Sequence, residues 1–447
     1  MTNSKNTKRA LLASILSVVL CCAMLIGSTF AWFTDSASTA VNNIQAGTLD
    51  VQLVDAETGA NLEGQTLNWK KAAEAPAGEA VLWEPGCTYE LPDVKIKNNG
   101  DLALKYKLVV SGVEGNAKLL EAIEFTYGNG IDLNTEGHLK AGETSSALTI
   151  KGHMKETAGN EYQGLSIDGI GITVVATQDT VEYDSNDNQY DDGAEYATPV
   201  STQEELLVAL EKGENVVLTQ QVTLPDAIEV AGNVTIYGSE NGTLSIPDGD
   251  SKRVININEQ IEPVTLTLSG VNVEGPKNGT YTRGISVYGN KDVTIVVDNS
   301  SVSASYYALN IASANENVEA VIKNTTLTGW CAAQTHSANT KMTFENCTLT
   351  GNNDKTYNAD GWNNFATIVV NETAGGSELT FNNCTIEANQ TTGNVQNLIS
   401  IRADSTINCD GCTFIVDGSK LNTVEEVLQH VDVNAGVNPT YSITNIK

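Results

Sequence analysis

The sequence predicts an all-β protein with two domains, a β-sandwich followed by a β-solenoid. Apolar and polar residues alternate over short stretches of residues 32–178, which is typical of half-buried antiparallel strands. From residue 266 onward, a unit of strand, turn and strand recurs every 22 to 37 residues, which indicates coils stacked on one another. We therefore expect domain limits at 1–31, 32–178, 179–199 and 200–447.

The first segment, residues 1–31, has the composition of an export signal. Basic residues precede an apolar stretch from 10 to 26, and small residues lead up to Ala31. We expect cleavage between Ala31 and Trp32, which places the mature protein outside the cell. The alternative is an uncleaved membrane anchor, because the apolar stretch approaches the roughly 20 residues that a spanning helix needs.

Strand periodicity and one turn signal describe the first mature domain. Leu102, Leu104, Tyr106 and Leu108 share one face of a predicted strand. The Asn-Asn-Gly sequence at 98–100 predicts a hairpin between the strands on either side, because Asn-Gly tolerates positive φ. A short helix is expected at 116–123. Together these elements predict a β-sandwich.

Three motifs of this region resemble one family. "TFAWFTD" at 29–35 is followed by "GTLDV" at 47–51, then by "PGCTYELPDVKIKNNGDLALKYKLVV" at 85–110 and "NEYQGLSIDGIGITVVATQ" at 160–178. In this order they resemble the TasA/camelysin family of secreted Gram-positive proteins, over about a third of the chain. The resemblance implies a jelly-roll sandwich and a place in an extracellular fibre, biofilm matrix or cell surface.

The resemblance also implies that the mature N-terminal segment is a donor strand that completes a sheet of the next copy. Such strand addition uses main-chain hydrogen bonds for affinity and alternate side chains for specificity. The alternative is that the segment pairs within its own domain. The apolar residues of the expected donor strand are Trp32, Phe33, Val41, Ile44, Leu49 and Val51.

Charge and residue types exclude several functions. The formal net charge of −30 argues against nucleic acid and anionic membranes as partners. The camelysin relatives carry a metallopeptidase label, but none of the four histidines lies in a His-Glu-x-x-His motif, so we expect no peptidase and no metal. The six cysteines beyond the leader are too sparse for a disulfide framework and predict packed thiols. These histidines are His138, His153, His336 and His430.

The stretch 179–199 is acidic and shows no periodicity, so we expect a solvated linker. Five of its side chains fall at the spacing of a calcium loop, but Gln189 stands where that loop requires glycine. Calcium is therefore the alternative to the expectation of no cofactor. The five candidate ligands are Asp184, Asn186, Asn188, Asp192 and Glu195.

Repeats in residues 200–447 predict columns of equivalent side chains in successive coils. A small-residue column and an apolar column are expected to point inward, and an asparagine column is expected at the turn before them. This pattern resembles right-handed parallel β-helices of the pectate-lyase-like class, including their N-terminal capping helix. The first column is Val271, Ser300, Thr325, Cys347, Cys384 and Cys412. The second is Val273, Val302, Leu327, Leu349, Ile386 and Phe414, and the third is Asn299, Asn324, Asn346 and Asn383.

Several local signals accompany the repeat. A capping box at Ser201/Glu204 or Thr202/Glu205 starts the capping helix, and a second helix is expected at 421–431. The Asn-x-Thr sequences recur at equivalent positions of the repeat, which indicates that they form its turns. Cys409-x-x-Cys412 is read as one strand with its thiols on opposite faces.

Aromatic residues in the solenoid predict a glycan-contacting face, because exposed rings stack on sugars; the alternative is that these rings pack against the coils. The residues are Tyr306, Tyr307, Trp330, Asp360 and Trp362. A lyase or hydrolase would use Arg283, Asp360 and Arg402, but no pair of acids is evident. We conclude that the chain is a non-enzymatic matrix or surface protein whose partners are copies of itself and glycans, held without a covalent wall anchor. The alternative is a polysaccharide-active enzyme or a passive adhesin.

Overall fold

The structure is a computed structural model. It describes residues 50–62, 67, 69–70, 81–115, 117–128, 130–165, 167–179, 196–238, 242–258, 262–289, 291–312, 317–353, 366–390 and 397–447. Several predicted features lie outside these residues: the cleavage site Ala31 and Trp32, the donor residues Trp32, Phe33, Val41, Ile44 and Leu49, the calcium set Asp184, Asn186, Asn188, Asp192 and Glu195, and the loop residues Asp360 and Trp362.

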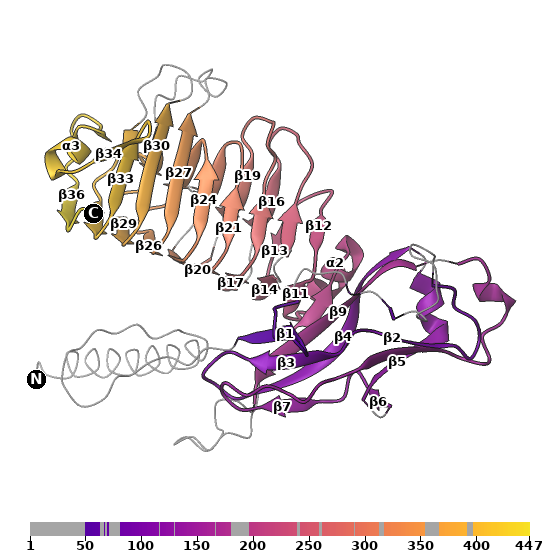
Figure 1. The fold of residues 1–447 in the computed structure, drawn as a ribbon. Coiled ribbons are helices and arrows are strands. Elements are labelled where there is room, and N and C mark those ends of the chain that lie inside the picture. The colour runs from indigo at the N-terminus through magenta and orange to yellow at the C-terminus, as the bar shows by residue number, and fades with distance from the viewer. Residues whose placement is uncertain are drawn as a thin grey trace, which may run out of the picture.

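Residues 51–178 form antiparallel sheets of order β1-β3, β2-β8-β5-β6 and β7-β4-β9 (Figure 1). The alternation predicted for β4 is confirmed for Leu104, Tyr106 and Leu108, which are buried, whereas Leu102 precedes the strand and is only half-buried. The three buried side chains share one core with Ile96 of β3 and Ile150 of β8, so the sheets pack as a β-sandwich. The strands are β1 (Val51–Asp55), β2 (Thr88–Glu90), β3 (Val94–Asn98), β4 (Leu104–Gly115), β5 (Ile123–Tyr127), β6 (Ile131–Asp132), β7 (Gly137–Leu139), β8 (Ile150–Met154) and β9 (Ile167–Gln178).

The hairpin predicted at 98–100 is wrong. β3 pairs with β1, whereas β4 pairs with β7 and β9. Asn98 is fully buried, and its Nδ2 donates to the carbonyl oxygens of Leu102 at 2.7 Å and Lys140 at 3.0 Å. The turn therefore leads the chain from one sheet into another. The Asn98 side chain stabilises this crossing by binding the backbone of Leu102 and Lys140.

The helices lie close to the predicted positions. The first is a 3-10 helix, η1 (Ala117–Ala122), and a second short one, η2 (Asn160–Tyr162), was not predicted. α2 (Gln203–Glu211) begins with a capping box in which Thr202 Oγ1 accepts from Glu205 N and Glu205 Oε2 accepts from Thr202 N. α3 (Val424–Leu428) begins with the same motif.

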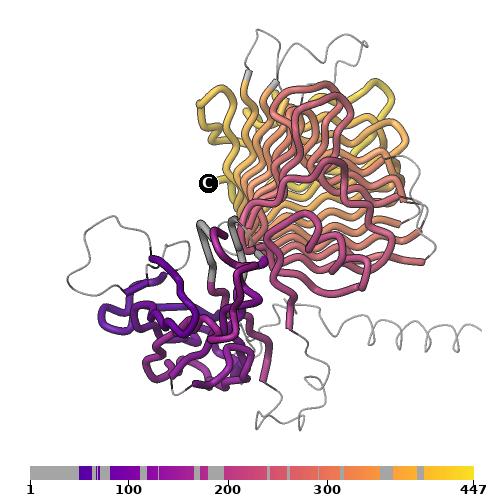
Figure 2. The backbone as a smooth tube through the Cα atoms, turned by 90° about the vertical axis from the view of Figure 1, so that its right-hand side faces the viewer, coloured from indigo at the N-terminus to yellow at the C-terminus, as the bar shows by residue number. Residues whose placement is uncertain are grey.

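Residues 198–444 wind into a parallel β-helix, and its coils stack in register (Figures 1 and 2). Apart from β34, which pairs antiparallel with β33, each strand pairs in parallel with its equivalent in the next coil. Three sheets result among the described strands, of ten, nine and eight strands.

The ten-stranded sheet consists of β10 (Thr198–Val200), β11 (Val216–Leu218), β14 (Val234–Gly238), β17 (Val264–Ser269), β20 (Val293–Asp298), β23 (Val318–Lys323), β26 (Lys341–Glu345), β29 (Glu378–Asn382), β32 (Thr406–Asp410) and β36 (Thr440–Thr444). The nine-stranded sheet consists of β12 (Gln221–Thr223), β15 (Thr243–Ser245), β18 (Asn272–Glu274), β21 (Ser301–Ser303), β24 (Thr326–Gly329), β27 (Thr348–Asn353), β30 (Thr385–Gln390), β33 (Thr413–Val416) and β34 (Ser419–Leu421). The eight-stranded sheet consists of β13 (Ile228–Val230), β16 (Arg253–Asn258), β19 (Arg283–Tyr288), β22 (Tyr307–Ile311), β25 (Cys331–Thr335), β28 (Ala366–Val370), β31 (Asn397–Ile401) and β35 (Val431–Val433).

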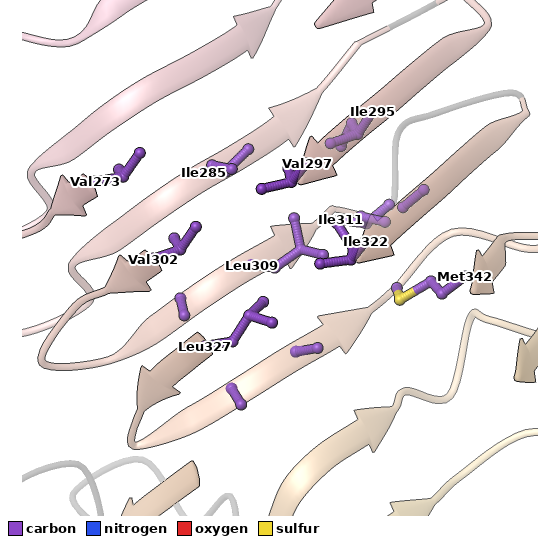
Figure 3. Close-up of a cluster of buried hydrophobic side chains, with 14 of the residues drawn as sticks. Val273, Ile285, Ile295, Val297, Val302, Leu309, Ile311, Ile322, Leu327 and Met342 are labelled. Carbon is purple, nitrogen blue, oxygen red and sulfur yellow. The ribbon is translucent and has the colours of Figure 1, made fainter. Parts of the chain in front are cut away.

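The predicted inward columns are confirmed. Val273 pairs with Val302 and Val302 with Leu327, and the same register continues to Phe414, with every member at most 1% exposed. Figure 3 shows several of these side chains meeting others from the two remaining sheets. Burying each such side chain stabilises the fold by about 1.5–3 kcal/mol.

The asparagine column is also confirmed, and the structure gives its cause. Asn299, Asn324, Asn346 and Asn383 all have positive φ, between 46° and 54°. Asparagine tolerates this left-handed conformation better than other residues that have a Cβ atom. Asn324 Nδ2 donates to Asp298 Oδ1 of the preceding coil at 2.8 Å, so the column also bonds along the stack.

The cysteine column points inward as predicted, and Cys347, Cys384 and Cys412 are at most 2% exposed and reduced. The prediction that Cys409 and Cys412 lie on opposite faces of one strand is wrong. A turn at Gly411, with φ of 63°, separates β32 from β33, so both thiols are buried in the interior. They are packed thiols, as the sequence indicated, but for a different geometric reason.

The asparagine column predicts different outcomes for two substitutions at Asn299, an exposed member. Asn299→Ala is expected to lower the free energy of unfolding by about 1 kcal/mol, because a Cβ atom without a polar side chain disfavours the left-handed region. Asn299→Gly should change it by less than about 0.5 kcal/mol. Urea unfolding measures both, and equal losses in the two variants would contradict the backbone explanation.

Candidate functional site

The outer face of the eight-stranded sheet holds a group of aromatic and cationic side chains that contact one another. The register aligns Arg253 of β16 with Arg283 of β19, and Arg283 with Tyr307 of β22. On the same strands Ile285 and Leu309 point into the core (Figure 3). One face of these strands therefore builds the core, while the strand starts carry polar and aromatic groups outward.

Three of the predicted glycan-contact residues form a buried cluster. The rings of Tyr306 and Tyr307 lie 3.8 Å apart between centroids, and Trp330 stacks on Tyr306 at 5.2 Å. Tyr307 Oη donates to Tyr306 Oη at 2.8 Å. Their exposed fractions are 8%, 9% and 3%, so the expectation of exposed rings is wrong for these three residues. These three rings therefore lie beneath the surface of this face rather than on it.

Tyr281 and Tyr288 are the aromatic residues of this face that reach solvent. Tyr281 is 38% exposed and meets Tyr306 edge-on at 5.4 Å. Its φ of 55° is unusual for a bulky side chain, and such conformations persist only where the surrounding structure holds them. Arg283 supplies one such contact, because its Nη1 donates to the Tyr281 carbonyl oxygen at 2.5 Å.

Two arginines flank Tyr288. The Arg253 Cζ atom lies 5.0 Å from the centroid of this ring and the Arg283 Cζ atom lies 6.0 Å from it. Burial lowers the pKa of Arg283, and the positive charge of Arg253 lowers it further. Burial alone would raise the pKa of Tyr288, but the hydrogen bond from Arg253 and both positive charges outweigh it, so that pKa is lowered.

The residues considered for catalysis are not brought together. Arg402 Nη2 forms an ion pair with Asp432 Oδ2 at 3.0 Å, on the coils next to the C-terminal end. Arg283 lies several coils away and has no carboxylate within ion-pair distance among the described residues. In the described part of the chain, this face therefore carries arginine and tyrosine side chains without the paired acids of glycoside hydrolysis.

A buried polar ladder runs along the same face and was missed from the sequence. Asn310 Nδ2 donates to Ser286 Oγ at 2.9 Å, and Gln334 Nε2 donates to Asn310 Oδ1. All three side chains are at most 3% exposed. In the sequence, this ladder is marked by a polar residue at the same position of three successive strands. Each of these polar residues lies between two inward-pointing apolar or small residues. The arginine pair had a similar signal, since Arg253 and Arg283 fall at equivalent positions of the repeat.

The histidines lie apart. His138 Nδ1 contacts Asp179 Oδ2 at 2.8 Å, while His153 Nδ1 contacts Thr88 Oγ1 at 2.9 Å. His336 contacts Asn371 at 3.1 Å, and burial lowers its pKa. Leu398 N donates to the backbone oxygen of His430. Among the described residues no three His, Cys, Asp or Glu side chains are placed to hold a metal ion.

A second candidate surface is the edge of the sandwich. β9, with 12 residues, is the last strand of the sheet β7-β4-β9. Its Ile172, Val174 and Ala176 pack against the core, which leaves its backbone edge as the end of that sheet among the described strands. Of the predicted donor residues, Val51 is described and pairs with Asn98 of its own domain. Val51 therefore pairs within its own domain, which is the alternative to strand donation.

The two ends of the expected linker are anchored near each other on the sandwich. Asp179 N donates to the Ala103 carbonyl oxygen at 3.0 Å. Tyr196 Oη donates to Glu136 Oε2 at 2.8 Å, and Lys107 Nζ lies 4.6 Å from the centre of its ring. Since β10 begins at Thr198, the chain enters the β-helix directly from this contact.

The protein thus belongs to the all-β class and consists of an antiparallel sandwich followed by a parallel β-helix. A family model described as Camelysin metallo-endopeptidase matches residues 6–62, a span that ends shortly after β1. The chain is similar to that family over this N-terminal part, and the match does not reach the β-helix. No curated protein and no solved structure matches the chain.

The part of the chain that the structure describes contains no helix long and apolar enough to cross a membrane.

The Tyr196 contact predicts a pH dependence of stability. Burial raises the pKa of Tyr196, and Glu136 raises it further. A raised phenol pKa contributes stability that is complete below the unfolded value of about 10 and is lost as pH rises above it. We expect Tyr196→Phe to unfold at a lower temperature than wild type at pH 8. The difference should shrink as the pH rises above about 10, as scanning calorimetry can measure. A difference independent of pH would contradict this contact.

Proposed function

We propose that the protein is exported and serves outside the cell as a structural protein of the biofilm matrix or cell surface. Its mature N-terminal segment, 32–49, would add as a strand to the sandwich of the next copy. The export signal in the sequence and the camelysin family match over residues 6–62 support the location. The N-terminal segment supplies the donor, and β9 supplies the acceptor.

The position of β9 carries this proposal. An edge strand presents main-chain donors and acceptors that pair readily with another chain. β9 is long, and its apolar side chains Ile172, Val174 and Ala176 lie beside the sandwich core. A segment whose apolar residues include Trp32, Phe33, Val41, Ile44 and Leu49 has side chains suited to extend that core. Val51 is left out, because it pairs with Asn98.

The β-helix fits the role of a stalk. Its coils repeat at about 4.8 Å, so a stack of ten strands spans roughly 40 Å. α2 and its capping box lie at one end of the stack, and α3 lies near the other. Protein filaments would then carry this rod and its outer face away from the assembled sandwiches.

A second candidate function is glycan contact by the outer face of β16, β19 and β22. Tyr281 and Tyr288 give this face rings that reach solvent. Binding is proposed in preference to turnover, because Arg402, one of the residues considered for catalysis, is held in an ion pair with Asp432.

Strand donation is tested by comparing two versions of the protein, one starting at Trp32 and one at Gly47. We expect filaments in negative-stain microscopy from the first version only. Hydrogen exchange of β9 amides should slow when filaments form, because a donor strand would protect that edge. The amides of β22, which lies inside the eight-stranded sheet, serve as the internal control and should not change.

Two results would count against the proposal. If both versions stayed monomeric at high concentration, the proposed polymerisation would be wrong. Filaments that leave exchange in β9 unchanged would show that another surface joins the copies.

A further inference from the structure

The arginines at positions 253 and 283 occupy an unusual electrostatic setting. The chain contains four arginines, Arg9, Arg253, Arg283 and Arg402, and carries a formal charge of −30. Two of the four are stacked on neighbouring strands by the parallel register, where like charges directly opposite repel. A strongly acidic protein thus concentrates positive charge at one place on its β-helix.

No carboxylate of the described residues compensates these two charges. Neither arginine takes part in an ion pair there, whereas Arg402 pairs with Asp432. The Nε atoms of Arg253 and Arg283 are buried without a hydrogen-bond partner. Arg253 Nη2 donates to Tyr288 Oη at 3.5 Å, and Arg283 Nη1 donates to the Tyr281 carbonyl oxygen. Both guanidinium groups also lie near the Tyr288 ring, and Arg283 lies 5.9 Å from the Tyr307 ring.

The two acids that precede Arg253 in the chain are engaged elsewhere. Asp248 Oδ2 accepts from Asn278 Nδ2 at 2.6 Å, Asp248 Oδ1 accepts from the backbone of Asn278 and Lys277, and Asp250 Oδ1 accepts from Thr280. These bonds join the turns that precede β16 and β19, and they hold the pKa values of both carboxyl groups below their usual range. The acids thus build the turns.

We propose that Arg253 and Arg283 form a binding site for the acidic group of a sugar chain, a carboxylate, sulfate or phosphate. This inference rests on the proposed glycan contact and specifies its ligand. Guanidinium groups match such oxyanions with two parallel hydrogen bonds, and their partly buried position strengthens the attraction. The exposed Tyr281 ring, next to Arg283, would stack on the sugar that carries the acid.

The arrangement also explains why this face keeps two like charges. Burying charged groups without a partner destabilises a fold, and the adjacent rings offset only part of that effect. A bound anion would supply the missing partner to both guanidinium groups at once. A ligand binds such a charged group with higher affinity, because no internal ion pair has to be broken first.

The test uses the mature full-length protein and three polymers with one backbone: dextran, carboxymethyl-dextran and dextran sulfate. We expect retention on carboxymethyl-dextran or dextran sulfate, weakened by salt, and weaker retention on neutral dextran. Arg253→Gln and Arg283→Gln should each reduce affinity about tenfold, the size of one charge-assisted hydrogen bond. Comparison of the two acidic polymers identifies the preferred acid.

Arg402→Gln is the matched control, because it removes the same charge from the same sheet at an arginine that already has a partner. It should leave polymer affinity unchanged. Arg283→Lys keeps the charge and loses the planar fork, so it should bind less tightly than wild type. Thermal unfolding of each variant shows whether it is folded at the temperature of the binding assay, so that a loss of affinity is not mistaken for a loss of fold.

Four other outcomes are decisive. Equal losses in Arg402→Gln and Arg283→Gln, or no binding to either acidic polymer, would overturn the proposal. Equal binding to all three dextrans, unaffected by the variants, would overturn the anion site while leaving glycan contact standing. Displacement by inorganic sulfate at an equal concentration of acid groups would support the anion site and count against the sugar contact.

Discussion

Parallel pairing in register between successive coils is the constraint on which the β-helix depends. Each residue lies about 4.8 Å from its equivalent in the next coil, so the sequence must place compatible side chains at every repeated position. Inward positions therefore collect apolar residues such as Val302 and Leu327. Turn positions that need positive φ collect asparagine, with Gly270 and Gly411 at the equivalent places in the first and last of these repeats. The inserted residues vary in number because they do not enter the pairing.

This constraint explains which features the sequence could predict. A column is visible in the sequence, because the residues that stack recur at related positions, so the sequence alone predicts the inward and asparagine columns. The hairpin at Asn98 shows the limit. Its turn residues indicate a change of direction, but β3 pairs with β1, about 45 residues earlier, while the buried Asn98 amide binds the backbone of Leu102 and Lys140. Burial of Tyr306 and Trp330 was likewise decided by contacts that local sequence does not encode.

Register acts on the outside of the coils as it does inside, and there it has an electrostatic consequence. Stacking equal residues is favourable for valine and asparagine, which gain contacts or hydrogen bonds from their equivalents. Stacking Arg253 on Arg283 is unfavourable unless another group neutralises them. Elsewhere on the β-helix the structure shows such neutralisation between coils, as in the ion pair of Lys323 with Glu345 at 3.1 Å. Among the described residues the arginine pair departs from that pattern, which is why we propose an anion as its partner.

The two domains treat their exposed strand edges differently, and this difference argues for separate roles. A β-helix has open edges at its two ends, and here α2 and the sandwich contact at Tyr196 lie at the first end, while α3 and the antiparallel strand β34 lie near the second. These devices limit pairing with other chains. The sandwich keeps β9 at the edge of its sheet, without a helix of comparable position in the described residues. Growth through the β-helix would need the opposite arrangement, so these strand edges favour the proposed growth through the sandwich.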